Sequence, residues 1–393
     1  MAKSVSIDHL PNPFEFGAEI EPARLVDREE ELGILTRAAV NRERLFLIGP
    51  RRYGKTSILA AAGAALEREN ITVLRYNVET YETLGRLAEA LLAGAAKKLT
   101  GTLQQAGETV KHMFARLRPG IDYNFTDQTL SITLGGATRG DEDTLPLLTD
   151  VLDAVNTLAG KAKRTAVVIL DEFQQAIREG GETAERQIRS VVQRHKNLAY
   201  IFAGSKTRML VEMTNSPERA FWKLGARYTL GPVPRVPFLE FLRGGFEDAG
   251  MRVRDGALEH LMDLSEDVPY NVQQLAHMSW ELLRTRPKES LTSAFVDGAL
   301  GTVVAREHSP YTQLWTSLTQ TQRIVVRAVI IEHGRNLRSK DALARYGLAA
   351  STMTRSLQTL DDRGVIREDE GEGVRYRLED PFLAAWLRWA QRS

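Results

Sequence analysis

The segment that most constrains this chain spans residues 49–56 and reads Gly-Pro-Arg-Arg-Tyr-Gly-Lys-Thr. It matches the pattern G-x-x-x-x-G-K-[ST] at every defined position, and each defined residue meets a need of a nucleoside triphosphate. Gly49 and Gly54 let backbone N–H groups approach phosphate oxygens. Lys55 places a cation against the β- and γ-phosphates, and Thr56 offers a hydroxyl group to Mg²⁺.

The segments on either side predict the structure that this pattern requires. Residues 44–48 form a short apolar run typical of a buried strand, and residues 57–69 are rich in Ala and Leu, which favours a helix. A helix that begins near Thr56 points the positive end of its dipole at a bound anion. The order of strand, loop and helix therefore predicts a phosphate-binding loop.

A second apolar run ends in two carboxylates. Residues 165–172 read Thr-Ala-Val-Val-Ile-Leu-Asp-Glu, the pattern of a strand buried on both faces of a parallel sheet. Ligands bind at the carboxyl ends of such strands. Asp171 is suited to hold Mg²⁺ through its water shell, and Glu172 is suited to polarise the attacking water. We expect the loop and these acids at the ends of two neighbouring parallel strands.

The composition is that of an ordinary globular protein. The 393 residues are enough for two or three domains, with 43% apolar and 26% charged residues. The net charge of +1 gives no global attraction to nucleic acid or membrane, and the absence of cysteine excludes disulfides and thiolate metal sites. With neither an apolar signal segment nor an apolar run of ~18 residues, we expect a cytoplasmic protein without a membrane partner.

The pattern of elements predicts three domains. Residues 1–231 are expected to form an α/β P-loop base with a parallel sheet and an inserted β-hairpin near residues 119–134. Residues 232–308 are mainly helical, and we term them the lid. Residues 309–393 give three helices and a β-hairpin, the order of a winged helix-turn-helix domain.

Several motifs resemble the archaeal-type ATPase family, in the AAA+/STAND branch of P-loop NTPases. The order of base, helical lid and winged helix also resembles initiator-type AAA+ proteins. The segments that carry the resemblance are Asn12-Pro13-Phe14, Val26-Asp27-Arg28-Glu29, the phosphate loop with Ser57, Leu170-Asp171-Glu172-Phe173-Gln174, Ala203-Gly204-Ser205, residues 268–275 and residues 379–383.

The resemblance implies ATP and Mg²⁺ as cofactors and assigns further roles. Ser205 takes the place of a sensor of the γ-phosphate, and Asn77 that of a polar residue that restrains the catalytic glutamate. The implied catalytic residues are Glu172, Lys55, Asp171 and Ser205, and the implied Mg²⁺ ligands are Thr56 and Asp171. The implied nucleotide-binding residues are Gly49, Pro50, Arg51, Arg52, Tyr53, Gly54, Lys55, Thr56, Ser57, Val26, Arg28 and Pro269.

Two features of the resemblance concern turnover. A cation that acts on a neighbouring subunit's nucleotide is expected just before the fifth strand, where Arg219, Lys223 and Arg227 all qualify. The lid helix that begins near Tyr270 has no arginine where initiator-type proteins supply a second sensor. The sequence therefore favours a slow, nucleotide-controlled switch over a fast motor.

The winged helix leaves two interpretations open. Its third helix carries polar residues that suit contact with duplex DNA, namely Ser351, Thr352, Arg355 and Gln358. Residues 368–372 of the wing are acidic, which instead favours contact with a protein. We therefore expect an ATP-binding, slowly hydrolysing switch that forms homo-oligomers, engages a partner protein and associates with DNA through the winged helix. The alternative is a signalling or defence switch that binds no nucleic acid.

Overall fold

The computed structural model describes residues 10–100, 102–114, 120–124, 129–134, 141–205, 207–369 and 375–390. Its contacts divide the chain into two compact units. The α/β unit comprises the described parts of Glu21–Gly49 and Lys55–Gly231. The C-terminal unit comprises Pro50–Gly54 and the described parts of Met1–Ile20 and Pro232–Ser393. Five residues of the phosphate loop therefore group with the C-terminal unit.

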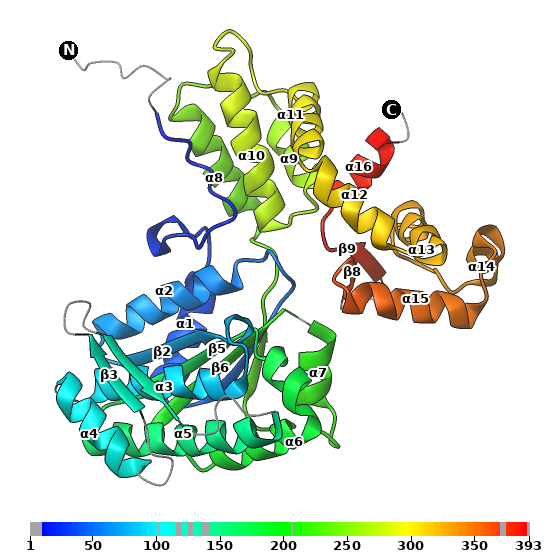
Figure 1. The fold of residues 1–393 in the computed structure, drawn as a ribbon. Helices are drawn as coiled ribbons and strands as arrows, with labels where there is room; N and C mark the ends of the chain where they lie inside the picture. The colour runs from blue at the N-terminus through cyan, green and yellow to red at the C-terminus, as the bar shows by residue number, and fades with distance from the viewer. Residues whose placement is uncertain are drawn as a thin grey trace, which may run out of the picture. The chain divides into compact units, whose positions relative to one another are not determined.

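A five-stranded parallel sheet forms the centre of the α/β unit (Figure 1). Its order is β2-β5-β6-β1-β7, which confirms the predicted P-loop fold class. The strands are β1 (Arg44–Ile48), β2 (Thr72–Asn77), β5 (Ala166–Asp171), β6 (Leu198–Gly204) and β7 (Ala226–Thr229). The expectation that the loop strand and the acidic strand are neighbours is wrong. β6 pairs with both β1 and β5 and lies between them, so a third strand end contributes to the same edge.

Two helical layers cover the sheet because its strands are apolar on both faces. On one face, the side chains of Phe46, Val168 and Phe202 join a core with α3, α5 and α6. On the other, α1 and α2 pack against each other (Figure 1). These helices are α1 (Glu29–Val40), α2 (Lys55–Arg68), α3 (Leu84–Leu99), α5 (Asp141–Ala162) and α6 (Gln174–Val192).

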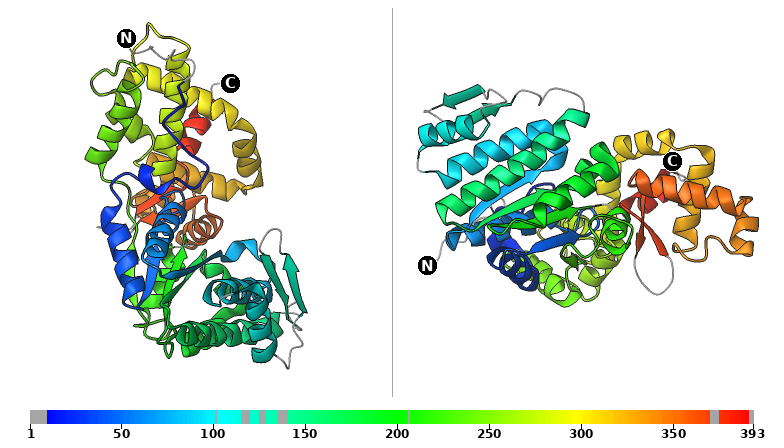
Figure 2. Two further views of the ribbon diagram at one scale, coloured as in Figure 1. Left: turned by 90° about the vertical axis from the view of Figure 1, so that its left-hand side faces the viewer. Right: turned by 90° about the horizontal axis from the view of Figure 1, so that it is seen from below.

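The predicted hairpin is present as β3 (Gly120–Asn124) and β4 (Thr129–Thr133), with its tip outside the described residues. β4 packs against α3 (Figure 2). The backbone N–H of Leu134 donates to Glu89 at 2.6 Å. The remaining elements of this unit are η2 (Pro22–Arg24), η3 (Val78–Thr80), α4 (Leu103–Met113) and α7 (Thr207–Asn215).

The C-terminal unit begins with the N-terminal segment packed on its helices. Phe14 is buried against Phe241 and Phe246, and Asn12 donates to the carbonyl oxygen of His277 at 3.1 Å. The helices that follow Pro232 are α8 (Arg235–Glu247), α9 (Ala257–Leu264), α10 (Pro269–Arg284), α11 (Ser293–Arg306) and α12 (His308–Ser317).

The last part of the chain has the predicted winged-helix order of three helices and a hairpin (Figure 1). A final helix, which the sequence patterns did not indicate, packs on α11 and α12. The elements are α13 (Gln320–Ile331), α14 (Lys340–Tyr346), α15 (Ala350–Asp362), β8 (Ile366–Asp369), β9 (Arg375–Leu378) and α16 (Phe382–Ala390). The end of the acidic wing, from residue 370 to 374, lies outside the described residues. Across the part of the chain that is described, no helix has the length and apolar character needed to cross a membrane.

Candidate nucleotide site

The phosphate loop connects β1 to α2, and two of its residues have a positive φ angle. Gly54 has φ +83°, a region that favours glycine, and Arg52 has φ +68°. α2 begins directly after Gly54, at Lys55. The first backbone N–H groups of a helix lack partners within it, so this helix start is suited to an anion.

Lys55 is held inside the α/β unit. It is only 5% exposed, and its ammonium group donates to the carbonyl oxygen of Gly49 at 2.8 Å. The Lys55 ammonium group therefore lies against Gly49, the first residue of the loop. A bound phosphate group would compete with the Gly49 carbonyl oxygen for this donor. Ser57, two residues after Lys55, is also buried in the first turn of α2.

Thr56 and Asp171 meet at the edge of the sheet. The Thr56 hydroxyl donates to Asp171 Oδ2 at 2.9 Å. Burial raises the pKa of Asp171 above its ordinary value, and the neighbouring charge of Glu172 adds to this shift. Hydroxyl and carboxylate oxygens are the ligands that Mg²⁺ prefers. A buried carboxylate beside a half-buried one is also an environment that a cation would stabilise, so these residues fit the metal.

Glu172 follows β5 and is held by a residue at the end of β6. The Ser205 hydroxyl donates to Glu172 Oε2 at 2.7 Å. The side-chain amide of Gln174, for which no functional role was predicted, donates to the same oxygen. The structure does not place Asn77 in the restraining role that the resemblance implied. Asn77 Oδ1 instead accepts the backbone N–H of Glu79 at 3.0 Å, because it caps the short helix η3.

The loop side chains contact other parts of the C-terminal unit. Arg52 forms an ion pair with Asp380 at 2.8 Å, and its guanidinium group lies 5.0 Å from the centre of the Tyr270 ring. The hydroxyl of Tyr53 accepts a hydrogen bond from Arg367 at 3.1 Å. The backbone N–H of Arg51 donates to the carboxylate of Glu379 at 3.1 Å. Pro50, the remaining residue of this stretch, has an intermediate exposure.

Other predicted nucleotide-binding residues have structural partners. Arg28 is buried, pairs with Glu31 at 2.6 Å and donates to the carbonyl oxygen of Gly231 at 2.9 Å. It therefore ties the start of α1 to the end of the α/β unit. Val26 is half-buried in the segment before α1. Pro269 belongs to the C-terminal unit, where it is the first residue of α10.

The three cation candidates before or within β7 have different environments. Arg219 forms a two-point ion pair with Glu185, with one contact of 3.0 Å between Arg219 Nε and Glu185 Oε2. The Arg227 guanidinium donates to the side chain of Asn215. The Lys223 ammonium lies 4.4 Å from the centre of the Trp222 ring.

The predicted DNA-contact residues all lie on α15 of the winged helix. Ser351, Thr352 and Arg355 are exposed, and Gln358 is half-buried and donates to Asp362 at 3.4 Å. In the described ranges, no cluster of three or more His, Cys, Asp or Glu side chains is arranged as a metal site.

Comparisons with known proteins identify two domains in this chain. A family model described as "AAA domain" matches residues 40–209, and one described as "Probable winged helix domain" matches residues 309–389. No curated protein matches the sequence.

Solved structures extend the likeness over both units. A Walker-type ATPase of Pyrococcus abyssi has a TM-score of 0.63 at 18% identity, over 96% of this chain and 99% of that chain. The ORC2 protein of Aeropyrum pernix, in ADPNP–ADP complexes, has a TM-score of 0.56 at 16% identity, over 96% of this chain and 98% of that chain. At such identities the likeness establishes the fold. The chain therefore contains an AAA domain with a phosphate-binding loop, followed by a C-terminal winged helix domain.

Proposed function

We propose that the α/β unit binds ATP with Mg²⁺ and hydrolyses it slowly. The observation that carries this proposal is the hydrogen bond between Thr56 and Asp171 beside a restrained Glu172. Thr56 and Asp171 would hold Mg²⁺, which neutralises phosphate charge when bound. Lys55 would hold the terminal phosphates, and Glu172 would accept a proton from the attacking water. Specificity for adenine rests on the family resemblance.

We propose slow turnover because the first turns of α10 supply no arginine. They carry Asn271, Gln273 and Gln274, which are all buried. An AAA domain without this cation lacks one group that stabilises the transferred phosphoryl group, so we expect slow hydrolysis. Slow hydrolysis keeps the nucleotide bound for longer, which suits a switch of the STAND kind. The bound nucleotide would then control association between copies of this chain and with a partner protein.

Light-scattering mass measurement tests this function. We expect Glu172→Gln with ATP to form a stable homo-oligomer, and the wild-type protein with ATP to form one that disappears as ATP is consumed. The ADP-bound protein should be monomeric. An identical mass in all three states would contradict the switch.

DNA association through the winged helix is a second candidate, favoured by the exposed Arg355 on α15. Duplex DNA should bind, and the affinity should fall steeply with salt because protein cations displace counterions from the phosphates. Arg355→Ala should weaken binding, whereas Arg306→Ala, on α11 of the lid, is a matched control that should not. Oligomerisation without DNA binding at low salt would favour the signalling or defence alternative.

A further inference from the structure

One oxygen of Glu172 is held from two directions. Ser205 donates to Glu172 Oε2 at 2.7 Å, and the Gln174 amide donates to the same oxygen. Gln174 Nε2 also lies 3.3 Å from Ser205 Oγ, so the three side chains form a closed triangle. Glu172 itself has φ +51°, a backbone conformation uncommon for this residue type. The glutamate is therefore fixed both at its backbone and at its carboxylate.

The orientation of the Gln174 amide follows from its partner. A carboxylate can only accept, so the NH₂ end of the amide must face Glu172, and the amide oxygen must face away. That oxygen points towards Gly204, where an added Cβ would lie 2.2 Å from it. The absence of a side chain at the last residue of β6 therefore makes the space for the amide.

Only one end of the Gln174 amide forms hydrogen bonds with the described residues. Gln174 is only 5% exposed, and among the described residues its Oε1 has no hydrogen-bond partner. A buried acceptor without a partner destabilises a fold, and an apolar side chain of similar length would avoid that loss. The amide at position 174 is therefore best explained by what its other end does to Glu172.

We propose that Gln174 is a positioning residue for ATP hydrolysis, an inference that rests on the proposed function. By occupying Oε2 together with Ser205, it fixes the Glu172 carboxylate and leaves Oε1 to accept a proton. In the reaction, the water oxygen bonds to the γ-phosphorus as the bond to the β–γ bridging oxygen breaks. A water proton passes to Glu172, and the products are ADP and inorganic phosphate.

The test is Gln174→Met, which keeps the length of the side chain but removes the amide. We expect kcat to fall about 10- to 100-fold, as for other losses of catalytic alignment. KM and the affinity for ATP should stay within about twofold of wild type, because the thioether side chain would not touch the phosphates. The melting temperature should be unchanged or higher. A wild-type kcat, or a loss of kcat that follows a lower melting temperature and weaker ATP binding, would overturn the proposal.

A second variant changes Gly204, which lies next to the amide oxygen of Gln174. Gly204→Ala would displace Gln174 as well as the Leu210 side chain, so it should also lower kcat, and the double variant with Gln174→Met should show little further loss. Additive losses would contradict action through Gln174. Glu172→Gln separates this inference from the proposed function. If wild-type phosphate release exceeds that of Glu172→Gln while Gln174→Met matches wild type, only the role of Gln174 fails. If wild type and Glu172→Gln release phosphate equally, both fail.

Discussion

The hydroxyl of Thr56 donates to Asp171 across 2.9 Å, although 115 positions separate the two residues in the sequence. Thr56 lies in the first turn of α2, and Asp171 ends β5. β6 lies between β1 and β5, so the two oxygens come from segments that follow strands which are not neighbours in the sheet. The fold of the α/β unit therefore already brings together the two side chains that we propose as Mg²⁺ ligands.

Asp171→Asn should stabilise the nucleotide-free protein. Burial raises the pKa of Asp171 above its value in the unfolded chain, so the ionised carboxylate destabilises the folded protein at neutral pH. This destabilisation disappears as the pH falls through the raised pKa and Asp171 becomes protonated. Replacing the carboxylate with a neutral amide should raise the melting temperature by about 2–4 °C at pH 7. The same variant should lose the extra stabilisation that Mg²⁺ adds to ATP.

Thermal unfolding with EDTA, Mg²⁺, ATP and ATP–Mg²⁺ measures both effects. Ser190→Ala is a suitable control, since its exposed hydroxyl donates to a carbonyl oxygen of its own helix. A melting temperature of Asp171→Asn below wild type would contradict the cost of ionising Asp171, and a full response to Mg²⁺ would contradict its role as a metal ligand.

Arg219→Ala should destabilise the protein without affecting chemistry in the folded fraction. Glu185, its partner, is 1% exposed, so the variant leaves a buried carboxylate without its cation. We expect a loss of about 2–3 kcal/mol in the free energy of unfolding, at the low end for buried pairs because Arg219 is partly exposed.

Urea denaturation gives the free energy, and phosphate release per folded molecule gives kcat. The double variant Arg219→Ala/Glu185→Ala should recover part of the stability, because it removes the unpaired charge. If the single variant instead keeps wild-type stability and loses kcat, Arg219 is the cation that acts on a neighbouring subunit.

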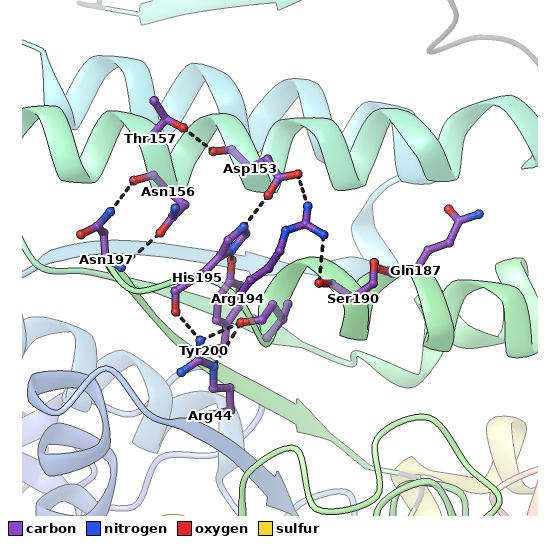
Figure 3. A network of polar contacts seen from close by, with 11 residues as sticks. Arg44, Asp153, Asn156, Thr157, Gln187, Ser190, Arg194, His195, Asn197 and Tyr200 are labelled. Carbon is purple, nitrogen blue, oxygen red and sulfur yellow. Dashed lines mark hydrogen bonds and ion pairs between the residues drawn. The ribbon is translucent and has the colours of Figure 1, made fainter.

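The network around His195 should make the stability of the fold depend on pH (Figure 3). His195 Nε2 lies 2.7 Å from Asp153, so it carries the proton, and Nδ1 accepts from the Tyr200 hydroxyl at 2.6 Å. Burial lowers the pKa of His195, and the contact with Asp153 offsets only part of this shift. Positive charge on Arg194 and Arg44 lowers it further.

The unfolded chain therefore binds a proton on His195 at a higher pH than the folded chain does. The contribution of His195 to stability should be constant above about pH 6.5 and fall as the pH drops below this value, by at most about 1.4 kcal/mol per pH unit. Urea denaturation at pH 7.5 and 5.5 should show a smaller pH effect in His195→Gln than in wild type. Equal pH effects in the two proteins would exclude His195 as the source.

The phosphate loop and the acidic strand were predictable because each is a local pattern with a chemical reason for every residue. Their geometry in space was not. Strand order depends on long-range pairing, so no local pattern indicated that β6 separates β1 from β5. The same limit hid Gln174, whose contact with Ser205 joins residues from two different strand ends. Asn77 was misassigned because a cap formed with its own turn is as compatible with its position as a contact with Glu172.

The prediction of the other elements shows the same difference between local patterns and long-range packing. The three helices and hairpin of the winged helix have strong local periodicity, and the structure contains them in the predicted order. α4, α7, α12 and α16 were not predicted, although α4 begins with a capping box formed by Thr102 and Gln105. Packing contributes to the formation of α16, which buries Phe382 and Trp386 and contacts α11 and α12.

The phosphates of ATP should bind to Lys55 and the loop around it, and the proposed ATP hydrolysis, the nucleotide-controlled association and the role of Gln174 all depend on this contact. Isothermal titration calorimetry of ATP in the presence of Mg²⁺ tests it most directly, with wild type, Lys55→Ala and Lys98→Ala compared at equal folded concentration. Lys98 is a matched control, because it is a partly exposed lysine on α3 paired with Glu67. We expect binding to wild type and Lys98→Ala, and a loss of at least about 100-fold in Lys55→Ala. Equal ATP affinity in all three proteins would contradict the assignment.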